Sequence, residues 1–338
     1  MTGSAEAPLR YVEGTEPGYT RRRKGEGWEY LTPEGRVLRS PRLIARLNAI
    51  ALPPAYTDAW FARDANAHLQ ATGYDARGRK QYRYHPAFRS QREDEKFGRC
   101  MDFGAILPRI RKAVERDLAR RDLSRERIVA AVVRLLDLGK VRVGNESYAR
   151  SNKSYGATTL RNRHVRVAGA RVRLDYVGKS GIRHRIGLED ARLARVVRRC
   201  QDLPGQMLFQ YQDADGAPHP VTSGDVNDWL RANGAEGFTA KHFRTFGASA
   251  LAFGLLAQAG GRTKLKPLLT EVSARLGNTP AVARKSYIHP AVIEAVLDPP
   301  ERNWRLPRAT RWLSPAERGL ITFLTERCRV GDDGAEAV

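Results

Sequence analysis

The chain has 338 residues, and its 59 Lys and Arg against 37 Asp and Glu give a formal net charge of +22. That length is enough for two domains with separate cores, and the cationic excess favours a polyanionic partner, with nucleic acid as the leading one. A basic surface without any ligand is the alternative, whereas a membrane protein is excluded because the apolar stretches are short and broken by charges.

Residues 1–20 lack hydrophobic periodicity and are predicted to hang loose, as is the acidic tail at residues 331–338. The first 20 residues also lack the apolar core of a signal peptide, so we expect a cytoplasmic, nucleoid-associated protein. Cys100, Cys200 and Cys328 are odd in number and far apart, and the histidines form no paired ligand set. These patterns predict reduced thiols and no structural metal.

Residues 21–90 are predicted to form a small, mostly β, N-terminal domain. Short runs rich in aromatic and β-branched residues predict strands at 28–31, 37–38, 68–72 and 80–84, with the first two joined by a turn at 33–35. The charge-rich segment 89–96 is interpreted as a linker that enters a helix.

Residues 91–330 are predicted to form a larger, mainly α-helical domain that contains a short antiparallel sheet, so the fold class is α+β. An apolar stripe predicts a helix over 128–136 that stops near Gly139, and a strand-like segment at 141–144 follows it. Strands are expected at 158–160, 164–167, 172–177 and 182–186, and the turn at 178–181 places Lys179 at a hairpin tip. Beyond residue 188 the chain is predicted to be helical, with Thr279-Pro280 and Ser314-Pro315 as helix starts.

Six stretches of the chain, taken in order, carry a family resemblance. They are Asp75 to Tyr82, Val141 to Tyr148, Thr159 to Val165, Val177 to Lys179, Lys241 to Thr245, and Gly277 to Tyr287. Together they resemble a type IB DNA topoisomerase of the small bacterial, poxvirus-like kind, over about residues 28–324. Each stretch alone is weak evidence, and only their joint order and spacing are specific.

The resemblance implies that Tyr287 attacks a phosphodiester to form a 3′-phosphotyrosine link and releases a 5′-hydroxyl. Arg142 and Arg244 would hold the non-bridging oxygens, and Lys179 would act as the general acid toward the leaving oxygen. Asn278 stands where viral and nuclear relatives carry histidine, and it can donate a hydrogen bond without ionising near neutral pH. The family places no carboxylate as the base for Tyr287, so depression of its pKa by nearby arginines and proton transfer to water both stay open.

The resemblance also implies duplex DNA as the partner, with Lys241, Gln81, Tyr82, Tyr84, Tyr148 and Arg161 as further DNA contacts. Transesterification is close to energetic balance, so neither a nucleotide nor a metal cofactor is expected. We expect a two-domain monomer that closes around DNA, cuts one strand, and lets the free end rotate before religation.

The sequence is also open to three other interpretations. A tyrosine recombinase shares the arginines, the lysine hairpin and the tyrosine, but typically carries His-x-x-Arg where this chain has Lys241-His242-Phe243-Arg244. A non-enzymatic DNA-compacting protein would need only the positive charge. Gly178-Lys179-Ser180 resembles the end of a phosphate-binding loop, but the glycine required five residues earlier is Arg173 and a strand follows the turn.

Overall fold

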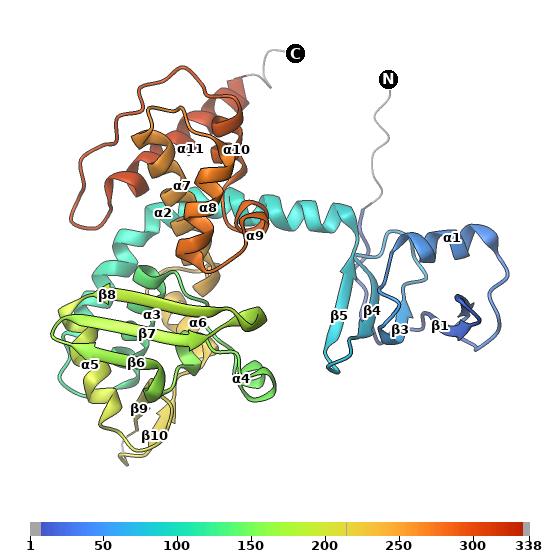
Figure 1. Ribbon diagram of the computed structural model, residues 1–338, viewed down its shortest axis with the longest axis horizontal. Helices are drawn as coiled ribbons and strands as arrows, with labels where there is room; N and C mark the ends of the chain where they lie inside the picture. Colours follow the sequence, from blue (N-terminus) through green and yellow to red (C-terminus); the bar gives the residue numbers. More distant parts are fainter. Residues whose placement is uncertain (1–7, 214, 334–338) are drawn as a thin grey trace. The chain divides into compact units, whose positions relative to one another are not determined.

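The structure is a computed structural model that describes residues 8–213 and 215–333. It divides into two compact units, residues 1–96 and 97–338 (Figure 1). Mostly antiparallel strands build the first unit, and helices with short sheets build the second, so the predicted α+β class is confirmed.

The first unit contains a five-stranded antiparallel sheet in the order β2-β1-β3-β4-β5. Its elements are β1 (Tyr19–Lys24), β2 (Gly27–Leu31), α1 (Pro41–Ala49), β3 (Thr57–Phe61), β4 (Leu69–Tyr74) and β5 (Lys80–Tyr84). Tyr30, Leu47 and Phe61 form part of the core between the sheet and α1. Strand β4 is buried over almost its whole length, whereas the outer strand β5 keeps several side chains open to solvent.

Several predictions for this unit are wrong in detail. Residues 8–20 do not hang loose: the Arg10 N–H donates to the carbonyl of Asn66 at 2.9 Å, and Val12 is buried. The hairpin partner of β2 is β1, whereas Val37 makes only an isolated bridge to Leu31. Residues 1–7 lie outside the described part of the chain, and nothing tests the prediction for them.

The expected linker at 89–96 is also wrong, because these residues are part of one long helix, α2 (Pro86–Leu118). The second unit continues with α3 (Arg125–Gly139), a buried helix whose end is capped by Lys140 in the left-handed conformation. The helix predicted over 128–136 is thereby confirmed. Next come α4 (Glu146–Asn152) and two short 3₁₀ turns, η1 (Ala157–Thr159) and η2 (Asn162–His164), so 158–160 is not a strand.

The predicted short sheet of the second unit is confirmed and has the order β6-β7-β8. Its strands are β6 (Val165–Ala168), β7 (Arg171–Val177) and β8 (Arg183–Glu189), and the 3₁₀ turn η3 (Lys179–Gly181) joins the last two. In β7, Val172, Leu174 and Tyr176 are buried. One face of this sheet therefore packs on the helical core, where α5 (Ala191–Gln201) contacts β6 and β7 (Figure 1).

The remainder of the chain is not wholly helical, because a small hairpin of β9 (Gln210–Gln212) and β10 (Pro218–Pro220) interrupts it. The helices that follow are α6 (Ser223–Ala232), α7 (Ala240–Gln258), α8 (Leu265–Leu276), α9 (Pro280–Ser286), α10 (Pro290–Leu297) and α11 (Pro315–Asp333). Both predicted helix starts are confirmed, since Thr279 caps α9 and Ser314 caps α11. Because α11 reaches Asp333, residues 331–333 of the predicted loose tail are helical, and 334–338 lie outside the described residues.

Candidate active site

Tyr287 lies immediately after the short helix α9, in the position that caps its C-terminus. Its backbone N–H donates to the carbonyl of Ala283 at 3.1 Å, and its own carbonyl accepts from the Ser249 hydroxyl on α7 at 3.1 Å. Ala283 is fully buried, and so is Ile288, the residue that follows Tyr287. Hydrogen bonds to α9 and α7 thus fix the backbone of Tyr287, while its side chain stays half-buried.

Arg244, from the first half of α7, lies against the ring of Tyr287. Its guanidinium carbon is 4.8 Å from the centroid of that ring, and the residue is only 3% exposed. Two of its nitrogens donate to the carbonyls of Lys140 and Leu276, the latter at 3.0 Å. These backbone acceptors fix the guanidinium without neutralising its charge, so the charge remains available to an anion.

Arg142 brings a second positive charge to the site, and it is hydrogen-bonded to the neutral Asn278. One terminal nitrogen of Arg142 donates to the side-chain oxygen of Asn278 at 2.8 Å. The segment around Arg142 is not a strand, contrary to the prediction, and is held by the Ala157 N–H, which donates to the Arg142 carbonyl at 2.8 Å. The Asn278 amide nitrogen is buried and has no hydrogen-bond partner among the described residues. A donor of this kind suits an anionic oxygen.

The electrostatics of the site favour ionisation of Tyr287. Burial acts to raise the pKa of the phenol, but the charges of Arg244 and Arg142 outweigh it, so the pKa of Tyr287 is lowered. Burial is also the main cause of the lowered pKa of Arg244, which the neighbouring Tyr287 partly offsets. Arginine stays protonated in proteins, so the phenol lies beside permanent positive charge.

The other predicted catalytic cation, Lys179, lies at the tip of the β7–β8 hairpin, as predicted. Its side chain is exposed, and no contact with Arg142, Arg244, Asn278 or Tyr287 is observed in the described part of the chain. Lys241 is likewise exposed, in the first turn of α7, while Arg244 one turn later is buried. Of the five predicted catalytic residues, Arg142, Arg244 and Asn278 are therefore gathered around Tyr287, and Lys179 stands apart from them.

The remaining predicted DNA contacts are spread over both units. In the first unit, Tyr82 and Tyr84 are exposed on β5 with their rings 6.1 Å apart and nearly parallel, and the Gln81 amide donates to Asp75 at 2.9 Å. In the second unit, Tyr148 is exposed on α4, and Arg161 lies over the ring of Tyr155 at 5.7 Å. Except for Gln81 and Arg161, which are half-buried, these side chains are open to solvent.

Comparison with known proteins identifies the family. Residues 85–298 match the family model described as eukaryotic DNA topoisomerase I, catalytic core, and residues 27–75 match bacterial DNA topoisomerase IB, N-terminal domain. The DNA topoisomerase 1B of Acanthamoeba polyphaga mimivirus is 33% identical over 298 residues, covering 84% of this chain and 89% of that protein. This chain belongs to the type IB DNA topoisomerases.

A more distant relative lies in the same family. The DNA topoisomerase 1B of vaccinia virus (strain Copenhagen) is 21% identical over 283 residues, covering 79% of this chain and 83% of that protein. Among solved structures, a XerH site-specific recombinase bound to palindromic difH substrate matches with a TM-score of 0.37 and 15% identity, over 54% of this chain and 47% of that chain.

Three side chains that support the site of this topoisomerase-family chain were missed by the sequence analysis. Ser249 is fully buried and links α7 to the segment that carries Tyr287, since it also accepts from the His289 N–H at 2.9 Å. Tyr176 and His184 lie on the buried face of the sheet next to Arg142 and Arg244. A polar residue inside the apolar α7 run was a usable signal for Ser249, whereas nothing in the pattern distinguished Tyr176 or His184 from core residues.

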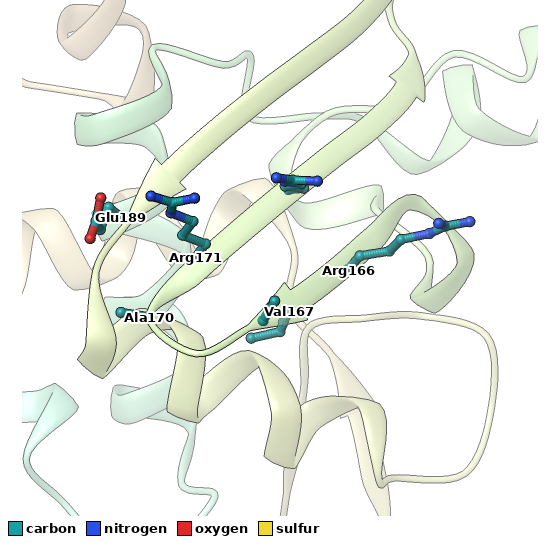
Figure 2. Close-up of a pocket in the computed structure, with 7 residues that line it drawn as sticks. Arg166, Val167, Ala170, Arg171 and Glu189 are labelled. Atoms are coloured by element: carbon teal, nitrogen blue, oxygen red, sulfur yellow. The ribbon is translucent and has the colours of Figure 1, made fainter.

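The outward face of the β6-β7-β8 sheet is rich in arginine. Arg166 and Arg173 stand directly opposite each other on neighbouring strands. An open pocket on this face is lined by Arg166, Val167, Ala168, Ala170, Arg171, Arg173 and Glu189, and Figure 2 shows Arg166 and Arg171 extending from it. None of the candidate catalytic residues lines this pocket.

Two further observations concern residues 8–213 and 215–333. No group of three or more His, Cys, Asp or Glu side chains is placed there so that it could share a metal ion. Every helix in these ranges is too short or too polar to cross a lipid bilayer.

Proposed function

We propose that this chain relaxes supercoiled duplex DNA by cutting one strand, allowing rotation, and resealing the strand without ATP or a metal ion. One observation carries the proposal: the half-buried phenol of Tyr287 lies beside the buried charge of Arg244, and Arg142 holds Asn278 next to them. Membership of the type IB family supplies the activity with which this geometry is consistent.

In the proposed cleavage step, the oxygen of Tyr287 attacks a backbone phosphorus. A bond forms between that oxygen and phosphorus, and the bond to the 5′-oxygen of the next nucleotide breaks. The protein is left joined to the 3′-phosphate, and the 5′-oxygen leaves as a hydroxyl after it receives a proton. Religation is the same sequence in reverse, so the bond energy is kept in the phosphotyrosine link.

Arg142, Arg244 and Asn278 are proposed to stabilise the transition state. As phosphorus gains a fifth oxygen, negative charge accumulates on the non-bridging oxygens, and fixed donors stabilise that charge more than they stabilise the ground state. The buried amide nitrogen of Asn278 is a free donor for one of these oxygens. The two guanidinium groups offer forked N–H donors for both.

Proton transfer is proposed to involve Lys179 and water. A lysine ammonium carries protons that it can donate to the leaving oxygen. The lowered pKa of Tyr287 prepares the phenol to lose its proton, and we propose that water receives it. Lys179 must move toward the phosphate for this chemistry, which would couple cleavage to DNA binding.

DNA binding is proposed to rest mainly on phosphate contacts, as expected for a net charge of +22. Lys241, Tyr148 and Arg161 would contribute from the second unit, and Gln81, Tyr82 and Tyr84 from the first. We further propose that the protein acts as a monomer in the bacterial cytoplasm, associated with the nucleoid.

The test is relaxation of a negatively supercoiled plasmid in EDTA without ATP. Wild-type protein is expected to relax the plasmid fully, and Tyr287→Phe is expected to bind DNA with similar affinity but leave it supercoiled. A wild-type protein that only shifts the plasmid without changing its linking number would indicate a DNA-compacting protein. Relaxation by Tyr287→Phe would show that another group is the nucleophile.

A further inference from the structure

The imidazole of His184 occupies a central place on the inner face of the β7–β8 hairpin. His184 is 7% exposed and pairs in register with Tyr176 of β7. The two rings are stacked, with centroids 5.0 Å apart and planes inclined by 12°. This packing holds the imidazole in one orientation beneath the hairpin tip.

Two glycines from different parts of the site enclose this ring. Gly178 directly precedes Lys179 at the hairpin tip, and Gly277 directly precedes Asn278. A Cβ at Gly178 would stand 2.7 Å from Cδ2 and Nε2 of His184, and a Cβ at Gly277 would collide with the other side of the ring. A single side chain thus touches the turn that carries Lys179 and the turn that carries Asn278.

The conformation of Gly178 shows that the ring, not the backbone, requires glycine there. Gly178 has φ −98°, a value open to any residue, so its lack of a side chain is explained by the close approach of His184. Gly277 differs, because its φ of +60° already favours glycine as the cap of α8. Position 178 is therefore the informative contact.

The surroundings of His184 keep it neutral. Burial is the main cause, and the charges of Arg244 and Arg142 add to it, so the pKa of His184 is lowered to about 4. The charged or titratable groups that face the ring are thus these two arginines and the stacked Tyr176. A neutral ring between them acts through its shape and not through a charge.

We propose that His184 is a positioning residue that holds the Lys179 hairpin tip against the Asn278 turn, so that the proton donor and the phosphate-binding groups keep a fixed position relative to each other. This inference rests on the roles proposed above for Lys179 and Asn278. Backbone bonds also hold the tip: the Gly178 N–H donates to the Ile182 carbonyl at 2.8 Å, and the Tyr155 N–H donates to the Val177 carbonyl at 2.8 Å. Those bonds shape the turn but do not tie it to the Asn278 turn.

The first test is single-turnover cleavage of an end-labelled oligonucleotide duplex. His184→Ala is expected to slow cleavage by about tenfold to a hundredfold, the range associated with a displacement of roughly 1 Å. Because His184 acts through Lys179, the double variant His184→Ala/Lys179→Ala is expected to cleave no more slowly than Lys179→Ala. Multiplied defects in the double variant would overturn the inference.

A second substrate separates positioning of the acid from general damage. In a duplex with a 5′-bridging sulfur at the cleavage site, the leaving thiolate needs no proton, so His184→Ala and Lys179→Ala should both cleave nearly as fast as wild type. If Lys179→Ala stays slow on sulfur, the proposed acid role of Lys179 fails, and the double-variant result still decides the role of His184. If only His184→Ala stays slow, the inference fails and the acid role stands.

Two further variants guard against misfolding. Gly178→Ala keeps the imidazole but displaces it and is expected to slow cleavage. The double variant Gly178→Ala/His184→Ala is expected to cleave no more slowly than His184→Ala alone. Ile186→Ala removes hydrocarbon from the same face of β8 without touching either glycine, and is expected to cleave within about threefold of wild type. A defect in Ile186→Ala equal to that of His184→Ala would show that only hairpin packing is involved and would overturn the inference.

Discussion

Replacing Asn278 by aspartate separates the two hydrogen-bonding ends of this side chain. The oxygen that accepts from Arg142 at 2.8 Å is kept, while the buried amide nitrogen, which has no partner among the described residues, is lost. The variant therefore retains the Arg142 contact and even strengthens it by adding charge. What it removes is the free donor that we assign to a non-bridging phosphate oxygen.

The expected size of the effect follows from that donor. Loss of one preorganised donor to a developing oxyanion costs about a hundredfold to a thousandfold in rate, roughly 2.7–4 kcal/mol. The added carboxylate also repels the phosphate, so we expect Asn278→Asp to slow cleavage by at least about a hundredfold. Thermal stability should change little, because no buried group of the fold loses its partner.

The assay is single-turnover cleavage of an end-labelled duplex at saturating protein, together with a thermal melt. Asn303→Asp is the matched control, because it adds the same charge at an exposed residue between α10 and α11 and should cleave within about threefold of wild type. Cleavage by Asn278→Asp within about threefold of wild type, with an unchanged melt, would refute the donor role of the amide.

Three other changes have defined outcomes. Asn278→His should add a step near pH 6–7 to the pH profile of cleavage that the wild type lacks, since imidazole titrates there, and superimposable profiles would contradict this. Ser249→Ala leaves the His289 N–H and the Tyr287 carbonyl without their partner, so it should lower the free energy of unfolding by about 1–3 kcal/mol and slow cleavage. The control Ser273→Ala loses only a hydrogen bond within α8 and should leave both the stability and the cleavage rate unchanged. Arg111→Met removes the ion-pair partner of the buried Glu317 carboxylate and leaves Asp137 with Lys140 as its remaining partner, so it should cost about 3–5 kcal/mol in denaturant unfolding near neutral pH. Burial opposes ionisation of both acids, but the charges of Lys140 and Arg111 lower the pKa of Asp137, and the charge of Arg111 lowers the pKa of Glu317. The cost of Arg111→Met should therefore shrink as pH falls below about 4, where both carboxylates become protonated in the unfolded chain. A cost that does not depend on pH would contradict the pairing.

Local signals in the sequence predicted much of the larger unit. The strands at 172–177 and 182–186, the turn between them and the Thr279-Pro280 start of α9 rest on short-range patterns, and each was confirmed. Such patterns succeed because alternation, caps and turns are decided by neighbours in the chain. The hairpin tip of Lys179 followed from them directly.

Elements that depend on tertiary packing were missed. Strand β1 consists largely of charged residues, Arg21 to Lys24, and gains its place by pairing with β2 and β3. The segment 89–96 looked like a linker because its charges hide the helical period, yet it continues the helix that begins at Pro86. In both cases partners outside the segment override its composition.

The candidate site shows the same division. Arg142, Arg244, Asn278 and Tyr287 were selected through a family resemblance, and the hydrogen bond between Arg142 and Asn278 joins residues more than a hundred positions apart in the sequence. Spacing alone does not reveal such contacts. The roles of Ser249 and His184 were missed for a related reason, because the role of a buried polar residue depends on the partners that surround it in the fold.

The most direct measurement of the central claim is the chemical polarity of the covalent complex trapped by denaturant on duplex DNA labelled at one end of the cut strand. With the label at the 5′ end, it should stay with the protein through Tyr287, and with the label at the 3′ end, it should be released on a fragment bearing a 5′-hydroxyl. Retention of the 3′-end label, or a trapped complex that persists in Tyr287→Phe, would contradict attack by Tyr287 to form a 3′-phosphotyrosine.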